Sequence, residues 1–342
     1  MFSKKFVRLK LAGTVAAAAA IGLTASLAQA ADAVKWNLAL FGSPAFRVAG
    51  ESLADYVNKN SGGSFQITVH KGTLSPAREV LDNLSVGAFE LGYVVSSYHP
   101  GKNPLMSVLD LPFLPIKTMR QRADIAEALF KHPAVKAEFA RWQTMPLMAV
   151  VQPNYEIMGK GKAPETLAAF KGMRIKATSG IGNALGKFGA VRVSMTGAEQ
   201  YNGLQTGVID AVAATPSAHG GWKLYELSKW YTVGMDAGSA HVTLVANAAA
   251  HRGLSKEHKA LLEKAKQHAY AKTIEAQSKA ASNYAPTLQK YKLRRIEVSS
   301  AMLKQLRDEA AKPVWDKFVS DLGKKGQPGK KILDFVLAEA KK

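Results

Sequence analysis

The stretch that decides the fold is residues 171–216, KGMRIKATSGIGNALGKFGAVRVSMTGAEQYNGLQTGVIDAVAATP. Its pattern predicts a strand, a helix, a short strand, a second helix and a third strand, in that order. Because residues two apart in a strand share a face, Arg174 and Lys176 point one way while Ile175 points the other. A turn at residues 179–182 opens the first helix, whose free N–H groups favour an anion at that point.

The second half of this stretch carries helix boundary signals. Thr196 and Glu199 have the spacing of a capping box at the start of a helix. Gly207 suits the end of that helix, because glycine tolerates a positive φ angle. Residues 208–212 then predict a strand that returns to the sheet. We therefore expect the whole stretch to form the centre of an α/β domain.

The first thirty residues have the pattern of a secretory signal peptide. Four basic residues precede an uncharged, alanine-rich segment from Leu11 to Leu27, and Ala28-Gln29-Ala30 is a small-x-small cleavage site. The apolar segment is shorter than the ~20 residues that a membrane span needs, and no cysteine follows it for lipid attachment. We predict cleavage after Ala30 and a periplasmic mature protein.

Composition narrows the function classes. The chain has no cysteine, so packing without disulfides must hold an exported fold together. Losing the four basic residues of the leader lowers the formal net charge from +20 to +16. Export argues against a nucleic-acid partner, and the basic surplus would steer anionic solutes toward the protein.

The remaining chain is long enough for two domains. Strands and helices alternate from residue 34 to 97, which predicts a parallel sheet covered on both faces. The chain crosses to a second domain near Gln152-Pro153, and a strand at 240–247 returns to the first. We expect domain I to hold residues 31–151 and 240–270, and domain II to hold residues 152–239 and 271–342, with the final segment from 286 packing on domain II.

One helix is predicted to link the two domains. Ser255 caps it, and it continues to about Ala285, just before Pro286. At ~1.5 Å per residue it is about 45 Å long, enough to run along both domains.

Enzyme signatures are missing from the sequence. It contains no G-x-S-x-G and no H-E-x-x-H motif, and its eight histidines are scattered. A structural zinc site needs cysteines or clustered histidines. We therefore predict no catalytic residues, no metal and no cofactor.

Several blocks, in order, resemble the DctP-type solute-binding proteins of TRAP transporters. The family pairs a "lkGlkiR" strand with a "p-eeyyaLqtGvvDg" helix and strand, which is similar to FKGMRIK and GAEQYNGLQTGVIDAV here. YHPGKNPLMSVLDLPFL upstream and WKLYELSKWYT downstream extend the likeness. The resemblance implies an α/β, two-domain periplasmic binding protein (Venus flytrap) with a long helix spanning both domains.

The resemblance also implies a site. The family's strand carries an arginine that forms a salt bridge with the substrate carboxylate, and Arg174 is assigned to that position, although Ile175-Lys176 follow it where the family often has Val-Pro. A guanidinium matches the two oxygens of a carboxylate. Asn154 stands where sialic-acid-binding members carry a second arginine, so a smaller or less polar organic acid is expected.

Further site residues are predicted from strand ends, where ligands of open α/β sheets bind. Their side chains offer either an aromatic ring or a hydrogen-bonding group. The aromatic candidates are Phe41, Tyr98, Tyr155 and Trp222, and the polar candidates are Ser96, Thr215 and His241.

We predict an extracytoplasmic receptor that binds an organic acid anion and delivers it to TRAP membrane permease subunits. The receptor is expected to be a monomer and not an enzyme. A receptor for an ABC importer or a sensor kinase is an alternative within the binding proteins. An exported hydrolase or isomerase without a recognisable motif is an alternative from another class, and a basic surface-interaction protein is a third.

Overall fold

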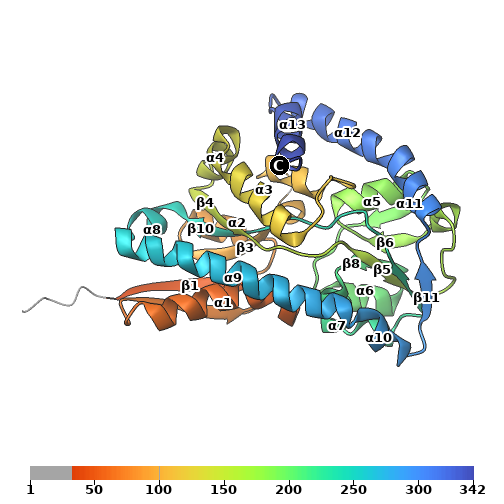
Figure 1. Cartoon of the computed structure of the whole chain (residues 1–342), viewed down its shortest axis with the longest axis horizontal. Helices are drawn as coiled ribbons and strands as arrows, with labels where there is room; N and C mark the ends of the chain where they lie inside the picture. The colour runs from red at the N-terminus through yellow and green to blue at the C-terminus, as the bar shows by residue number, and fades with distance from the viewer. Residues whose placement is uncertain (1–32, 100) are drawn as a thin grey trace, which may run out of the picture. The chain divides into compact units, whose positions relative to one another are not determined.

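The computed structural model of the chain describes residues 33–99 and 101–342, and shows two β-sheets with helices around them (Figure 1). The predicted signal peptide and its cleavage site lie outside these residues. The first sheet contains β1 (Val34–Leu40), β2 (Phe65–Lys71), β3 (Leu91–Val95), β4 (Thr144–Ala149) and β10 (Val242–Asn247). The second contains β5 (Glu156–Gly159), β6 (Arg174–Lys176), β7 (Val191–Val193), β8 (Ala211–Ala214), β9 (Trp230–Val233) and β11 (Arg294–Glu297).

The helices account for most of the rest. The α-helices are α1 (Pro44–Asn60), α2 (Val80–Ser85), α3 (Met119–Lys131), α4 (Pro133–Ala140), α5 (Ser179–Gly186), α6 (Gln200–Thr206), α7 (Pro216–Gly221), α8 (Ala248–Arg252), α9 (Lys256–Ser282), α10 (Tyr284–Gln289), α11 (Ser300–Leu306), α12 (Lys312–Gly323) and α13 (Gly329–Glu339). Short 3₁₀ turns are η1 (Ser96–Tyr98), η2 (Pro104–Asp110), η3 (Leu167–Phe170) and η4 (Leu224–Glu226), and η5 (Arg307–Ala311) is a π-helical turn. None of the helices in this part of the chain is long and apolar enough to cross a membrane.

The first sheet has the strand order β2-β1-β3-β10-β4. β1 pairs in parallel with β2 and with β3, as the alternation of strands and helices predicts. β10 lies antiparallel between β3 and β4, which confirms that the strand at 240–247 returns to the first sheet.

The second sheet has the order β11-β9-β5-β8-β6-β7. Residues 171–216 supply β6, α5, β7, α6 and β8, in the predicted order, and β6 lies parallel between β7 and β8. Gly207 ends α6 at a φ of 75°, a left-handed conformation that favours glycine. The capping box forms only in part: Glu199 Oε2 accepts from the Thr196 backbone N–H at 2.6 Å and from its hydroxyl at 2.9 Å.

Two crossing segments, residues 150–155 and 236–242, lead from one sheet to the other and lie side by side. The Val150 N–H donates to the Val242 carbonyl at 2.8 Å, and the Tyr155 N–H donates to the Gly238 carbonyl at 3.0 Å. Between these bonds, Gln152 Nε2 donates to the Ala240 carbonyl at 3.2 Å. Side-chain and backbone bonds thus hold the two crossings together.

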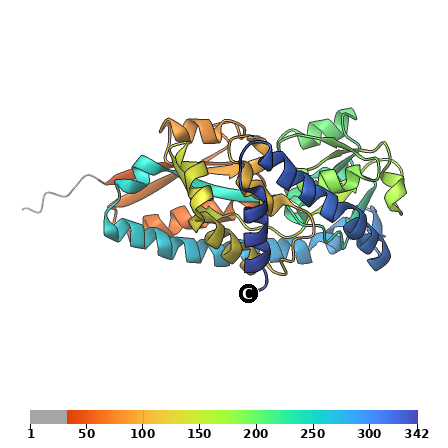
Figure 2. The same ribbon diagram turned by 90° about the horizontal axis from the view of Figure 1, so that it is seen from above.

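Helix α9 extends past both sheets, as Figure 2 also shows, which confirms the predicted long helix. It packs against α1 and α3 near the first sheet and against α7 and α10 near the second. Ser255 caps it by accepting from the His258 N–H at 3.1 Å. The helix ends at Ser282, and α10 follows with Pro286 inside it.

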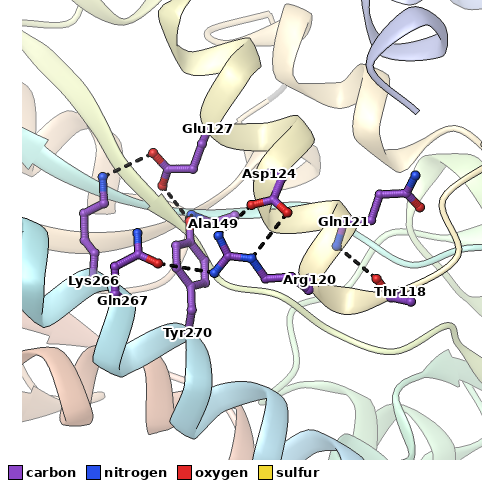
Figure 3. A network of polar contacts seen from close by, with 9 residues as sticks. All are labelled: Thr118, Arg120, Gln121, Asp124, Glu127, Ala149, Lys266, Gln267 and Tyr270. Atoms are coloured by element: carbon purple, nitrogen blue, oxygen red, sulfur yellow. Dashed lines mark hydrogen bonds and ion pairs between the residues drawn. The ribbon is translucent and has the colours of Figure 1, made fainter. Parts of the chain in front are cut away.

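A polar network attaches α9 to the first sheet (Figure 3). Lys266 Nζ lies 3.2 Å from Glu127 Oε2 and 3.0 Å from Glu263 Oε2. The Tyr270 hydroxyl donates to Glu127 at 2.6 Å and accepts from the Ala149 N–H of β4 at 2.9 Å. Each polar group buried here has a partner, so the network can hold helix and strand in one position.

The last helices depart from the predicted domain assignment. Met302, Leu306 and Ala310 pack in the core of the second sheet, as expected. From Val314 onward, the apolar residues of α12 and α13 join the core of the first sheet instead. The expectation that the whole C-terminal segment packs on domain II is therefore wrong for these two helices, whose apolar stripes cover η2 and α3.

Candidate functional site

A cavity of about 540 Å³ lies between the two sheets. Its lining residues include the ends of four strands: Phe41 follows β1, Val95 ends β3, Lys176 ends β6, and Thr215 follows β8. Ligands of open α/β sheets bind at such carboxyl ends. The volume is within the range of small-molecule sites.

Lys176 supplies the buried charge of this cavity. Its side chain is 6% exposed, and burial lowers its pKa to about 8. No ion pair or hydrogen bond within residues 33–99 and 101–342 uses its ammonium group. A buried ammonium without a carboxylate partner is costly, so an anion entering the cavity would relieve that cost.

The neighbours of Lys176 do not supply a negative charge. His219 is buried and bonded through its two ring nitrogens to the Val212 carbonyl (3.1 Å) and the Tyr284 hydroxyl (2.8 Å). Burial, and then the charge of Lys176, lower the pKa of His219 to about 3, so this histidine is neutral. His219 therefore adds no charge that could balance Lys176, whose lowered pKa has burial as its only cause.

Other buried polar groups face the cavity without partners. Ser43 and Gln200, 3% and 1% exposed, line it, and their side-chain oxygen and amide groups make no hydrogen bond to any described residue. Thr178 precedes α5 and lines the cavity, but its hydroxyl does not cap the helix. Ser43 precedes α1 in the same way. Unsatisfied buried polar groups are rare, and here they leave hydrogen-bonding capacity for a ligand.

Aromatic rings form much of the remaining wall. Phe41, Phe46 and Tyr98 come from the first sheet and its helix, Tyr155 from a crossing segment, and Trp222 from the end of α7. Phe41 lies 6.0 Å from Phe46 and 6.4 Å from Tyr98, measured between ring centroids.

The other cations of the lining have partners or lie at its exposed rim. Arg47 and Lys71 both pair with Glu51, at 3.3 Å and 3.0 Å. Arg78 is exposed and lies over the Tyr98 ring, 5.4 Å from its centroid. Lys176 is thus the buried cation among the lining residues.

The structure brings five of the predicted site residues together in the cavity wall. These are Phe41, Tyr98, Tyr155, Thr215 and Trp222. Burial raises the pKa of Tyr98 to about 12 and raises that of Tyr155 further, so both hydroxyls remain protonated at neutral pH. The ligand contacts of these five residues stay predictions.

Arg174 does not line the cavity, which corrects the prediction that it points into the cleft. It starts β6, while Lys176 ends it, and its guanidinium forms a two-pronged bond with Asp210: Nε to Oδ2 at 3.0 Å and Nη2 to Oδ1 at 2.6 Å. The Arg174 side chain is 45% exposed. This bond from Arg174 holds the pKa of Asp210 below its usual range. Arg174 therefore ties β6 to the turn before β8.

Three more predicted residues lie outside the cavity lining. Asn154 bonds to Asp236 beside the crossing segments. Ser96 is buried behind Val95, the neighbour that does line the cavity. His241 is buried, bonds through Nε2 to the Thr243 hydroxyl at 2.9 Å, and has its pKa lowered to about 3, chiefly by burial. Ser96 and His241 are thus absent from the lining, although their chain neighbours Val95, Ala240 and Val242 belong to it.

Sequence reasoning missed Lys176, Ser43 and Gln200. Lys176 shares a strand face with Arg174, but the family motif distinguishes the two residues. In "lkGlkiR" the arginine stands four residues after the glycine, so counting from Gly172 places it at position 176 and not at 174. Ser43 and Gln200 carry no comparable signal, because a serine before a helix is usually its cap. Groups of three or more residues able to hold a metal do not occur in the described part of the chain.

The geometry defines a class of protein with two α/β lobes, one around each sheet. The two crossing segments join the lobes, and a cavity of small-molecule size lies between them. A family model described as bacterial extracellular solute-binding protein, family 7 (DctP), matches residues 41–321. The chain therefore belongs to the DctP family of extracellular solute-binding proteins, which confirms the resemblance.

Similar proteins agree with this assignment. The 2,3-diketo-L-gulonate-binding periplasmic protein YiaO of Escherichia coli is 25% identical over 226 residues, 65% of this chain and 68% of that protein. A TRAP solute-binding protein from Rhodoferax ferrireducens, solved with copurified benzoate, superposes with a TM-score of 0.80 at 20% identity, covering 90% of this chain and 97% of the other. A marine metagenome TRAP solute-binding protein, solved with 3-hydroxybenzoate, has a TM-score of 0.80 at 19% identity and covers 91% and 99%.

Proposed function

We propose that this protein captures an organic acid in the cavity between its lobes, with the acid's carboxylate paired to the ammonium of Lys176. The observation that carries the proposal is the buried, unpartnered Lys176 at the end of β6. Ser43 and Thr178, at the starts of α1 and α5, add hydroxyls and helix N-terminal dipoles that favour an anion. Excluding water strengthens these charge-assisted bonds.

The relatives support a carboxylate ligand. YiaO is named for 2,3-diketo-L-gulonate, and the two solved proteins hold benzoate and 3-hydroxybenzoate. Each of these compounds carries a carboxylate. The proposal extends that chemistry to this chain, and it includes release of the acid unchanged, without catalysis.

The receptor role implies partners and a compartment. The protein would deliver its ligand to the membrane subunits of a TRAP-type secondary transporter, acting as a monomer in the periplasm after cleavage behind Ala30. The two similar solved structures are of TRAP solute-binding proteins, which supports this partner.

Ligand capture would use the crossings as a hinge. The proposed division falls at residues 150–155 and 236–242, so that the first lobe holds the first sheet and the second lobe holds the second. This division differs from the boundaries predicted from the sequence at the C-terminus, where α12 and α13 join the first lobe. Closure of the lobes would seal Lys176 from water.

Calorimetric titration with organic acids tests the proposal. Lys176→Met should weaken the best ligand by about 30- to 100-fold, or ~2–3 kcal/mol, because a charge-assisted contact is lost. Arg174→Met is the matched control: it removes a basic residue of the same strand outside the cavity, and should leave affinity within about twofold. Equal losses in both variants, or a loss in Arg174→Met alone, would contradict the role of Lys176.

A further inference from the structure

We propose that the ligand is an aromatic monocarboxylate whose ring lies between Phe41 and Trp222 while its single carboxylate meets Lys176. This inference rests on the proposed function, because it names the acid that the same cavity selects. Two features carry it: the number of free buried charges and the arrangement of aromatic rings.

One buried cation implies one carboxylate. A second carboxylate inside the cavity would need its own partner, since an unpaired buried charge is strongly disfavoured. Arg47 and Lys71 share the single carboxylate of Glu51, and neither is buried. Arg78 lies exposed at the rim beside Glu199, whose pKa its charge helps to lower. A dicarboxylate would therefore leave one charge without a buried partner.

Aromatic rings lie on both lobes. On the first, Phe41 is at the centre of a ring cluster, with centroids 6.0 Å from Phe46, 6.1 Å from Tyr93 and 6.4 Å from Tyr98. These separations lie within the range in which aromatic pairs attract each other. The half-buried Phe41 lines the cavity, so a ligand ring can extend the cluster by one member.

Trp222 provides the wall on the second lobe. The backbone of Gly197 lies against its indole, where an added Cβ would be 3.5 Å from Nε1, and Gly197 lines the same cavity as Tyr98 of the first lobe. Trp222 and the Phe41 cluster thus line the same cavity from opposite lobes. A flat ring suits the space between two such walls better than a branched chain.

Part of the remaining lining offers no hydrogen-bonding side chain to a polyhydroxylated acid. Val95, Ala214, Ala218, Ala240 and Val242 are apolar. The Thr215 hydroxyl is already used, because it accepts from the Ala218 N–H at 3.1 Å and lies 2.9 Å from the Ser217 hydroxyl. A sugar acid would place hydroxyls against these apolar side chains, where they find no partner, which is unfavourable.

The test compares four acids by calorimetric titration of the dialysed protein: benzoate, cyclohexanecarboxylate, isophthalate and gluconate. Benzoate should bind about tenfold more tightly than cyclohexanecarboxylate, which matches its charge and size but lacks the π system. Isophthalate should bind more weakly than benzoate, because its second carboxylate has no buried cation. Gluconate should show no measurable heat of binding.

Variants then locate the selectivity. Phe41→Leu and Trp222→Leu should reduce the benzoate-to-cyclohexanecarboxylate ratio to near one, a change that a merely structural role would not produce. Tyr225→Leu is the matched control and should keep the ratio, because the Tyr225 ring lies against Tyr291, with centroids 4.2 Å apart, outside the cavity lining.

The outcomes separate the two proposals. If gluconate or isophthalate binds more tightly than benzoate and loses affinity in Lys176→Met, the inference of an aromatic monocarboxylate is overturned and the receptor function stands. If cyclohexanecarboxylate equals benzoate, the ring preference is likewise overturned. If none of the acids binds, and a wider set of organic acids also produces no heat, the carboxylate receptor function itself fails.

Discussion

Two lysines, Lys176 and Lys266, are equally buried in the described chain, each 6% exposed, yet their surroundings differ. Lys266 on α9 lies between Glu127 and Glu263, in a network that also engages Tyr270 (Figure 3). Lys176 faces a cavity and has no acidic partner. The comparison teaches that burial alone does not mark a functional lysine. The absence of a counter-ion is the better indication of a functional lysine, because a buried unpaired charge destabilises the fold and a bound anion can relieve that destabilisation.

The largest expected effect is on the pH dependence of binding. Ligand-free Lys176 loses its proton near its pKa of about 8, whereas a bound carboxylate would hold the proton on. Affinity should therefore fall by about 100-fold between pH 7 and pH 10, or ~2.7 kcal/mol. Titrations across this range measure the slope.

The control for this experiment is Lys176→Arg. Arginine stays charged throughout the range, so the slope should vanish even if the absolute affinity changes. A slope that persists in Lys176→Arg would assign the titration to another group and remove the proposed contrast with Lys266.

The next effect is on the stability of the ligand-free protein. The folded pKa of Lys176, about 8, lies below its unfolded value of 10.5, so between these values the unfolded chain binds more protons. Stability from this group therefore rises with pH, by about 2 kcal/mol from pH 8 to pH 10. Urea denaturation should show the stability advantage of Lys176→Met over wild type shrinking by that amount. A constant difference between the two proteins would mean that Lys176 is not destabilised by burial.

Removing the other lysine should cost stability and spare binding. Lys266→Met leaves the partly buried Glu127 without its cation, and we expect the free energy of unfolding to drop by ~1–2 kcal/mol. Lys264→Met, an exposed residue of the same helix, is the surface control and should change stability by less than ~0.5 kcal/mol. If Lys266→Met were more stable than wild type, Lys266 would destabilise the fold as Lys176 does, and the contrast between the two lysines would be wrong.

The smallest effect is expected for Arg174→Lys. The substitution breaks the two-pronged bond to Asp210 but keeps the charge, at an exposed site where such pairs contribute ~1 kcal/mol or less. Melting temperature should shift by a few degrees at most, and ligand affinity should stay within about twofold. A marked loss of affinity would return Arg174 to the binding site.

Much of the fold follows from local pattern. The order of β6, α5, β7, α6 and β8 is readable from alternating apolar residues and Gly207, since these signals act over a few neighbours. The α12 and α13 assignment failed because an amphipathic helix shows only that it covers a core, and either core would satisfy its apolar stripe.

The site was predictable only in part, for a similar reason. Period-two alternation places Arg174 and Lys176 on one face and cannot say which end of a three-residue strand reaches the cavity. That choice depends on Asp210, which binds Arg174 at the far end. Four candidates that follow strand or helix ends line the cavity, as does Tyr155 on a crossing segment: Phe41, Tyr98, Thr215 and Trp222. Ser96 follows β3 and His241 precedes β10, yet neither lines the cavity, because a position near a strand end does not fix the direction of a side chain.

One feature at the C-terminus bears on how the lobes can move. Residues 300–323 form a continuous helical path through α11, the π turn η5 and α12 (Figure 2). Its apolar side chains change from one core to the other within that path. A helix resists stretching, so this path and α9 act as two struts of constant length between the lobes. The proposed opening would then be a rotation that preserves both lengths. The wider π turn η5 interrupts the regular bonding of the helix, so it is the place where the path from α11 to α12 would bend.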